Sequence, residues 1–260
     1  MNYRFIEELS MNHWQPLSTL LYDGWLLRFA DGYTKRANSI SPIYGSTCDL
    51  HEKIKACESI YSANHLPTTY KITPFVQPEH LDRILEERGY SRIDTTSVQI
   101  LNLEQLIEPK LSSVIIQEHV SAEWLDHFCR LNHVEEQFRG VMERMLSNIR
   151  TKKGFISFYH EGQVVACGFG VIEREYMGLY DIVTDENYRN RGFGEQMILN
   201  LLTWGKEHGA KHSYLAVVAD NVPALRLYSK LGYSEVYQYW YRVKHNLKEN
   251  NFETIQQSKN

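Results

Sequence analysis

The 260-residue sequence contains only four cysteines, and none of them belongs to a C-x-x-C pair. This spacing argues against a zinc ribbon or a dithiol redox motif. Unpaired thiols are typical of a reducing compartment, so a cytoplasmic location is expected. The opening stretch "MNYRFIEELSMNHW" lacks the apolar segment of a signal peptide, and no apolar run approaches the ~18 residues that a membrane helix needs. We therefore expect no membrane partner.

The sequence also lacks the signatures of metal and nucleic-acid binding. Its eleven histidines include no H-E-x-x-H motif, and Gly209 interrupts the helix that would bring His208 and His212 together. We therefore predict no metal site. The formal net charge of -4 provides no overall positive field that would attract nucleic acid or anionic lipid, so neither is expected as a partner.

An internal repeat is the first feature that the sequence does contain. Residues 81–101, "LDRILEERGYSRIDTTSVQIL", resemble residues 224–243, "ALRLYSKLGYSEVYQYWYRV". Each segment is a helical pattern followed by Gly-Tyr-Ser and a run rich in strand-forming residues. Gly89 and Gly232 stand where a helix would end in the left-handed conformation that glycine adopts readily.

The elements upstream of these segments occur in the same order in both halves. In the first half, "RANSISPIY", "CDLHEKIKACESIYSANH" and "TTYKIT" are typical of a strand, a helix and a strand. In the second half, "MGLYDIVT", "GEQMILNLLTWGKEHG" and "HSYLAVVA" show the same order. Chance similarity of short amphipathic segments is the alternative, and a matching order over about sixty residues argues against it. We therefore expect an α/β fold built from two copies of one unit, joined near residues 102–113.

The stretch "YRNRGFGEQM" places two arginines and two glycines between a predicted strand and a predicted helix. At a helix N-terminus several backbone N–H groups lack partners, and the peptide dipoles leave partial positive charge. Glycine lets an anion approach the backbone closely, and Arg189 and Arg191 add full charges. Residues 189–194 therefore predict a phosphate-binding loop, with an ordinary glycine turn as the alternative. The absence of G-x-x-x-x-G-K-[ST] and G-x-G-x-x-G argues against a P-loop and a dinucleotide fingerprint.

The wider segment resembles the GNAT superfamily, the Gcn5-related N-acetyltransferases. "MGLYDIVTDENYRNRGFG", an amphipathic helix and "SYLAVVADNVPALRLYSKLGY" match that family in order and spacing, over about residues 113–245. The stretch "DGWLLRFADGYTKRANSISP" and the closing "YWYRV" look like those of tandem-domain members. The resemblance implies a tandem GNAT fold, with two repeats of a mixed, mostly antiparallel sheet flanked by helices.

The resemblance also implies an enzyme that uses acetyl-CoA as cosubstrate without a metal. The backbone of Ile182, Val183 and Thr184 would pair with the pantetheine arm. The pyrophosphate would be bound by the loop formed by Arg189, Asn190, Arg191, Gly192, Phe193 and Gly194. Asn221 would lie near the cofactor arm, and Tyr228 would act as the general acid that protonates the departing thiolate.

Tyr228 has an alternative interpretation, because it shares helical spacing with Leu225 and Leu231 and such a stripe usually packs in a core. The family motif favours catalysis. A thiol pKa of about 8.5 and a tyrosine pKa of about 10 make the proton transfer feasible. Backbone N–H groups at the end of "YDIVT" could stabilise the oxyanion of the reaction.

The sequence does not identify the general base. An alkyl ammonium with a pKa of about 10.4 must lose a proton before it can attack a thioester. Many family members have a glutamate four residues before the pantetheine-binding triplet, but Gly178 occupies that position here. The acidic alternatives are Asp181, Glu173, Glu135 and Glu136. Glu135 and Glu136 lie between two predicted helices, and a place on a solvated helix face is the expected interpretation for either one. A water relay without a single base is a further alternative.

The first half lacks this machinery. By the repeat offset, Leu85 and Pro78 stand where the second half has Tyr228 and Asn221, and "YGSTCDLH" replaces the phosphate loop. Arg36 and Asn38 could contact substrate, although structural roles on a strand are expected for both. The predicted domains are a degenerate GNAT-like domain over 1–105, a catalytic GNAT domain over 113–245 and a polar tail over 246–260.

These features predict an acetyl-CoA-dependent N-acetyltransferase that acetylates a primary amine by direct attack in a ternary complex. The acceptor amine is not identified, and a monomer or a homodimer is expected. One alternative is a CoA-binding or acyl-CoA-binding sensor or interaction protein without catalysis, which the missing glutamate supports and Tyr228 opposes. Another alternative is an enzyme that transfers a longer acyl group or acts on a protein amine.

Overall fold

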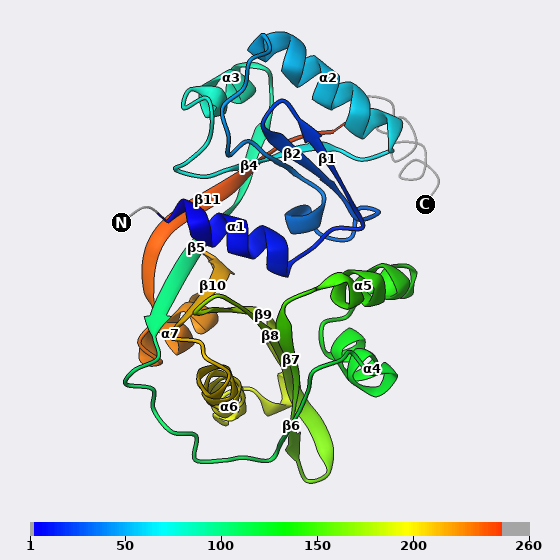
Figure 1. Cartoon of the computed structure of the whole chain (residues 1–260). Coiled ribbons are helices and arrows are strands. Elements are labelled where there is room, and N and C mark those ends of the chain that lie inside the picture. The colour runs from blue at the N-terminus through cyan, green and yellow to red at the C-terminus, as the bar shows by residue number, and fades with distance from the viewer. Residues whose placement is uncertain (1–2, 246–260) are drawn as a thin grey trace. The chain divides into compact units, whose positions relative to one another are not determined.

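The described residues of the computed structural model, 3–245, form two compact units (Figure 1). Residues 3–15 and 96–238 are called the larger unit here, and residues 16–95 and 239–245 the smaller unit. The expected domains over 1–105 and 113–245 follow the sequence repeat rather than compactness, and they stay a prediction. The expected polar tail, 246–260, lies outside the described residues.

The larger unit is a mixed α/β structure built on one sheet. Its elements are α1 (Arg4–His13), β6 (Val114–Gln117), α4 (Ala122–Leu131), α5 (Glu136–Asn148), β7 (Lys152–His160), β8 (Gln163–Glu173), β9 (Tyr176–Thr184), η2 (Glu186–Tyr188), α6 (Phe193–Glu207), β10 (His212–Val218) and α7 (Val222–Lys230), with parts of β5 (Ser91–Asn102) and β11 (Ser234–Lys244). In spatial order the strands are β6, β7, β8, β9, β10 and β5. Neighbouring strands run antiparallel except β9 and β10, which are parallel. The expected mixed, mostly antiparallel sheet is confirmed.

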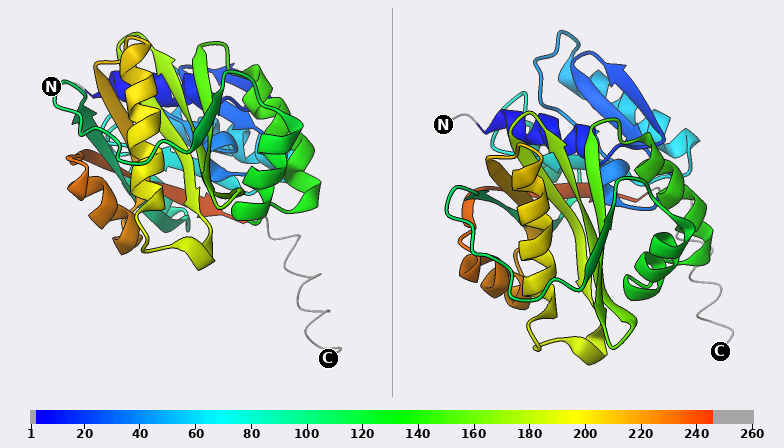
Figure 2. Two further views of the ribbon diagram at one scale, coloured as in Figure 1. Left: turned by 90° about the horizontal axis from the view of Figure 1, so that it is seen from below. Right: turned by 60° about the horizontal axis from the view of Figure 1, so that its bottom comes forward.

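Helices cover both faces of this sheet (Figure 2). On one face, α6 contributes Met197 to a buried cluster that also contains Leu179 of β9. On the other face, Trp14 at the end of α1 stacks on Phe169 with ring centroids 5.7 Å apart. Trp124 of α4 meets Phe155 edge-on at 4.9 Å on that face. Because side chains alternate across a strand, the central strands supply apolar residues to both cores.

The smaller unit has a sheet of its own, packed against two helices. Its elements are β1 (Ser18–Tyr22), β2 (Trp25–Phe29), η1 (Lys35–Ala37), β3 (Ile40–Ser41), α2 (Leu50–Ala63), β4 (Thr68–Ile72), α3 (Leu81–Glu87) and the end of β11. The strand order is β1, β2, β3, β4 and β11, with one parallel pair, β3 and β4. Its core centres on the aromatic residues Trp25, Tyr61 and Tyr70.

Each unit contains the last strand of the other sequence repeat. β5 ends the first repeat, yet Thr96–Asn102 pair antiparallel with β10 in the larger unit. β11 ends the second repeat, yet Trp240–Lys244 pair antiparallel with β4 in the smaller unit. The predicted order of strand, helix, strand, helix and strand is confirmed in both halves. The exchange means that each sheet is completed by a strand distant in sequence.

The helices of the repeat end as the sequence predicts. Gly89 follows α3 with a φ of 81°, and Gly232 follows α7 with a φ of 94°. Both glycines therefore adopt the left-handed conformation that closes a helix at low cost. Within residues 3–245, no helix has both the length and the apolar character that a membrane span requires.

The polar segment between β5 and β6 is fastened to α6 by two buried amides. The side-chain carbonyl of Gln196 accepts hydrogen bonds from the backbone N–H groups of Lys110 and Leu111, at 2.6 and 3.0 Å. Asn200 donates from Nδ2 to the Leu111 carbonyl at 2.6 Å. Both amides are 9% exposed, so their hydrogen bonds replace water for this stretch of backbone.

We predict that Gln196→Met lowers the free energy of unfolding by about 1–3 kcal/mol, because two backbone N–H groups lose their acceptor. Urea unfolding followed by circular dichroism measures this loss. Gln137→Met, at an exposed position early in α5, is the matched control and is expected to change stability by less than about 0.5 kcal/mol. Equal effects of the two changes would contradict the role of Gln196.

Candidate active site

The candidate site begins where two parallel strands part. β9 and β10 pair through Tyr176, Met177 and Gly178, opposite His212, Ser213 and Tyr214. Within the described residues, no pairing between them continues past Gly178 and Tyr214. β9 runs on to Thr184 against β8 alone, and β10 runs on to Val218 against β5. The two strands therefore form a fork, and one backbone edge of β9 faces its opening.

A bulge redirects β9 inside this fork. Cys167 of β8 lies opposite Val183, whereas Phe169 lies opposite Tyr180, so β9 has an extra residue between them. Asp181 sits in the bulge with a φ of 47°. Gly168 faces the bulge from β8, and a Cβ there would lie 2.6 Å from Cδ1 of Ile182. A bulge of this kind bends its strand and takes one residue out of the regular ladder.

The predicted phosphate loop joins this fork to the N-terminus of α6. Gly192 is the N-cap of α6, has a φ of 84° and provides no side-chain cap. The first N–H groups of a helix have no partner within it, so those of α6 are left for another acceptor. A Cβ on Gly194 would lie 2.8 Å from Oγ1 of Thr184, which shows how closely the helix passes the end of β9. Phe193 is buried and packs against Phe158, which anchors the start of the helix.

Two exposed arginines flank the helix N-terminus. Arg189 donates from Nε to the Thr184 carbonyl at 3.3 Å, so it lies beside the end of β9. The guanidinium of Arg191 lies 5.1 Å from the centre of the Tyr188 ring. Asn190 stands between them with a φ of 62°. The structure thus brings the predicted pantetheine strand and the predicted phosphate loop together, with Arg189 and Arg191 in the loop that precedes α6.

The helix α7 supplies the two remaining predicted residues. Asn221 is exposed and caps α7, where Oδ1 accepts a hydrogen bond from the Ala224 N–H at 3.2 Å. Tyr228 is 8% exposed, and burial together with the charge of Asp181 raises its pKa to about 12. A Cβ on Gly194 would come within 3.9 Å of Leu227, so α7 lies beside the start of α6.

Tyr228 belongs to the core and also to the fork. Its ring packs with Leu231 in a buried cluster and meets the Tyr233 ring edge-on at 5.8 Å. The influence of Asp181 on its pKa places the β9 bulge within electrostatic reach of the tyrosine. The stripe expected from helical spacing therefore does pack in the core.

The four acidic candidates for the general base occupy different places. Asp181 lies in the bulge, within electrostatic reach of Tyr228. Glu173 pairs with Tyr176 at the other end of β9, about 25 Å along the strand from Thr184. Glu135 and Glu136 are exposed at the start of α5.

The position of the family glutamate is filled by other side chains. A Cβ added to Gly178 would lie 2.8 Å from the Tyr180 hydroxyl and 2.8 Å from Cζ of Tyr214. These distances are shorter than side chains tolerate, so glutamate does not fit here without displacing a tyrosine. Sequence reasoning missed both tyrosines, because nothing in their spacing places them around one glycine.

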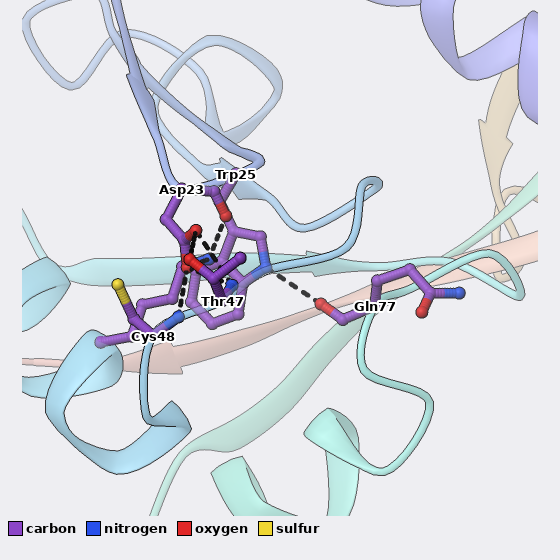
Figure 3. Close-up of polar contacts among 6 residues, drawn as sticks. Asp23, Trp25, Thr47, Cys48 and Gln77 are labelled. Carbon is purple, nitrogen blue, oxygen red and sulfur yellow. Dashed lines mark hydrogen bonds and ion pairs between the residues drawn. The ribbon is translucent and has the colours of Figure 1, made fainter.

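The corresponding loop of the smaller unit is occupied by a carboxylate of the chain itself. Figure 3 shows Asp23 accepting hydrogen bonds from the backbone N–H groups of Thr47 and Cys48, each at 2.9 Å. Lys53, which is buried, donates to the same carboxylate at 3.2 Å. The N–H of Cys48 and then that of Thr47 hold the pKa of Asp23 well below its usual range. The backbone N–H groups of Thr47 and Cys48, which precede α2, therefore already donate to a carboxylate of the chain. The sequence did not predict this contact, because Asp23 is distant from the loop in sequence.

Arg36 and Asn38 were expected on a strand, but Arg36 lies in the 3-10 helix η1 (Lys35–Ala37) and Asn38 is the residue that follows it. Asn38 accepts hydrogen bonds from the N–H groups of Ala30 and Gly32 and donates to the carbonyls of Ala30 and Thr34. The carbonyl of Arg36 accepts a hydrogen bond from Arg28 at 2.7 Å.

Comparison with known proteins places this geometry in a family. A family model described as "Probable histone acetyltransferase Rv0428c C-terminal" matches residues 2–242. A Bacillus subtilis (strain 168) protein named "Uncharacterized N-acetyltransferase YobR" is 28% identical over 248 residues, which are 93% of this chain and 98% of the relative. The chain belongs to the family of that model, and it is an acetyltransferase of the GNAT superfamily.

Solved structures confirm the fold. A GCN5-related N-acetyltransferase from Kribbella flavida superposes with a TM-score of 0.70 at 13% identity, over 95% of this chain and 97% of that one. A tandem GNAT protein from the clavulanic acid biosynthesis pathway gives a TM-score of 0.61 at 15% identity, over 73% and 67% of the two chains. At these identities the likeness concerns architecture alone.

Proposed function

We propose that the protein transfers an acetyl group from acetyl-CoA to a primary amine, by direct attack within a ternary complex. The observation that carries this proposal is the meeting of the β9 bulge, the uncapped N-terminus of α6 and Tyr228 around one fork in the larger unit. The fork provides backbone donors and acceptors for an extended amide-containing arm. The helix N-terminus with Arg189 and Arg191 suits a pyrophosphate.

The residues of the chain divide the chemical work. Acetyl-CoA supplies a thioester whose acetyl carbon accepts the amine nitrogen. Backbone N–H groups released by the bulge stabilise the negative charge that develops on the carbonyl oxygen. A base takes one proton from the ammonium before attack, Tyr228 gives its hydroxyl proton to the departing sulfur, and the second proton that the nitrogen loses on forming the amide restores Tyr228, so the proton count balances. Asp181, whose charge contributes to the raised pKa of Tyr228, is the base candidate that this proposal favours among the four acidic residues.

Release of free thiol from acetyl-CoA, measured across a panel of primary amines, tests this proposal together with binding calorimetry. We expect thiol release with at least one amine, and one acetyl-CoA site per chain because Asp23 occupies the corresponding loop of the smaller unit. Thiol release with none of the amines, despite tight CoA binding, would favour the sensor. Two equal sites per chain would contradict the assignment of the smaller unit, and faster turnover of a longer acyl-CoA or of a protein amine would favour those alternatives.

We predict that Gly192→Glu weakens acetyl-CoA binding by about 100-fold, or about 3 kcal/mol, because its carboxylate would oppose the pyrophosphate. Gly209→Glu is the matched control. Both glycines have a positive φ and open space where a side chain would lie, but Gly209 is at the other end of α6, about 22 Å away. Calorimetric titration of both variants separates loss of the site from backbone strain. If Gly192→Glu and Gly209→Glu bound acetyl-CoA with equal affinity, the loop would be excluded as a phosphate site.

We predict that Tyr228→Phe lowers kcat by about 10²–10⁴-fold and leaves acetyl-CoA affinity nearly unchanged, because it removes the proton donor and keeps the ring. A pKa of about 12 keeps Tyr228 protonated, so the parent should show no loss of kcat from its ionisation up to pH 10. Tyr233→Phe is the control, because its hydroxyl contacts Ser213 at 2.6 Å and serves stability. If Tyr228→Phe lowered kcat by less than about threefold, Tyr228 would have a packing role alone.

A further inference from the structure

A row of four side chains connects the point where the fork opens to the surface of the larger unit. The hydroxyls of Tyr180 and Tyr214 lie 2.8 Å apart. The Tyr214 hydroxyl lies 2.8 Å from Nδ1 of His13, the last residue of α1. Nε2 of His13 lies 3.6 Å from Oε2 of Glu173. The first three side chains are buried, whereas that of Glu173 is 20% exposed.

The row has a defined hydrogen-bond direction. Burial lowers the pKa of His13 to about 3, so at neutral pH its ring carries one N–H and one lone pair. A carboxylate beside Nε2 favours the tautomer with the proton on that nitrogen. Nδ1 is then an acceptor, so Tyr214 donates to His13 and Tyr180 donates to Tyr214. The oxygen of Tyr180 is thereby set to accept a hydrogen bond.

The end of the row at the fork stands where an attacking amine would need a base. Tyr214 is the last residue of β10 that pairs with β9, and Tyr180 immediately precedes the bulge at Asp181. The two tyrosines also surround Gly178, where glutamate does not fit. Trp14 stacks on Tyr180 with ring centroids 6.0 Å apart, which shields the row from water.

The other end of the row is a carboxylate held at the surface. Asn12 donates from Nδ2 to Oε2 of Glu173 at 3.0 Å, which fixes the carboxylate beside His13. Nε2 of His13 is buried and has no hydrogen-bond partner within the described residues. The 3.6 Å separation is slightly longer than a hydrogen bond, and catalytic hydrogen bonds often tighten when substrate binds. The remaining ionisable groups near Tyr214 are Glu7 of α1 and Tyr237 of β11, which hydrogen-bond each other.

We propose that this row relays the proton of the attacking amine from the fork to Glu173. The inference rests on the proposed function and replaces the missing single base with four residues. Tyr180 is the member that would touch the amine. Tyr214, His13 and Glu173 act through it.

The proton count of the relay balances. The ammonium form of the amine passes one proton to the Tyr180 oxygen while the Tyr180 proton passes to Tyr214, and the nitrogen lone pair freed in this way then bonds to the thioester carbon. The Tyr214 proton passes to Nδ1 of His13, and the Nε2 proton passes to Glu173. Both tyrosines and the imidazole end neutral, and the carboxylate ends protonated. After the products leave, the same steps in reverse deliver the proton to water at the fork and restore the starting tautomer.

The decisive experiment is the pH dependence of kcat/KM for Glu173→Gln with the best alkylamine of the panel. The substituted amide keeps an acceptor for Asn12 but cannot take a proton. We expect a loss of about 10- to 100-fold at pH 7, at or below the usual worth of a general base because water can substitute in part. The loss should shrink below about threefold by pH 10, where much of the amine is already neutral.

Matched variants separate the relay from structural effects. Glu175→Gln, in the turn after β8 where Glu175 contacts Lys211, is the control and should retain parental kcat/KM at every pH. Tyr214→Phe interrupts the row, and its combination with Glu173→Gln should lose no more activity than the more affected single variant. Acetyl-CoA affinity should stay at the parental value in each variant.

An independent measurement concerns His13 itself. Nitrogen-15 NMR of the imidazole should show the neutral form with the proton on Nε2 from pH 5 to pH 9. The tautomer with the proton on Nδ1, or titration of His13 near its ordinary pKa, would overturn the relay. A Glu173→Gln variant with parental activity at pH 7, or with a loss that is constant with pH, would also overturn it while leaving the proposed function intact. A parent that acetylates no amine would instead refute the proposed function on which the relay depends.

Discussion

The parting of β9 from β10 is the constraint on which the rest of the site depends. Parallel strands that separate leave backbone donors and acceptors without partners, and such groups are costly to bury unless something else pairs with them. Here the fork opens after Gly178 and Tyr214, and the bulge at Asp181 interrupts the ladder between β8 and β9. The sheet can keep this defect because apolar cores on both faces stabilise β9. The proposed function assigns this fork to the extended arm of the cosubstrate.

The loop before α2 in the smaller unit and the loop before α6 in the larger unit differ in what lies next to their backbone N–H groups. In the smaller unit, Asp23 brings a carboxylate to the loop before α2, and the buried Lys53 balances its charge. In the larger unit, Gly192 begins α6 without a side-chain cap, and exposed arginines surround the free N–H groups. A carboxylate of the chain itself occupies the first loop, whereas in the proposed function the second loop receives its anion from a ligand. This contrast is the physical reason for proposing a phosphate site in the larger unit and none in the smaller unit.

Much of the fold could be predicted from local sequence. Helical periodicity, strand-forming runs and the glycines at 89 and 232 all act over a few residues, and the structure follows them. The loop over residues 189–194 could be recognised for the same reason, since its glycines and arginines are contiguous, and its role as a phosphate site stays a prediction. The exchange of β5 and β11 was not readable, because both strands carry the same pattern and only long-range pairing decides which sheet each joins.

The polar contacts that complete the site were beyond sequence reasoning. Asp23 meets Thr47, and His13 meets Tyr214, across separations of 24 and 201 residues. A bulge that places Asp181 in the left-handed region likewise depends on Gly168 in the neighbouring strand. Such contacts arise from the packing of strands and helices, and no short motif encodes them.

Burial has a consistent effect on the proton carriers around the fork. Removal from water penalises the charged form of any group, so it raises the pKa of Tyr228 and lowers that of His13. Both side chains are therefore neutral at physiological pH, although one is an acid and the other a base. The carboxylates of Asp181 and Glu173 instead lie in partly exposed places, where water reduces the cost of their charge. In the proposed reaction, protons move between buried groups that are neutral before and after each transfer. The charged carboxylates are partly exposed to water, so no step requires an isolated ion in the core.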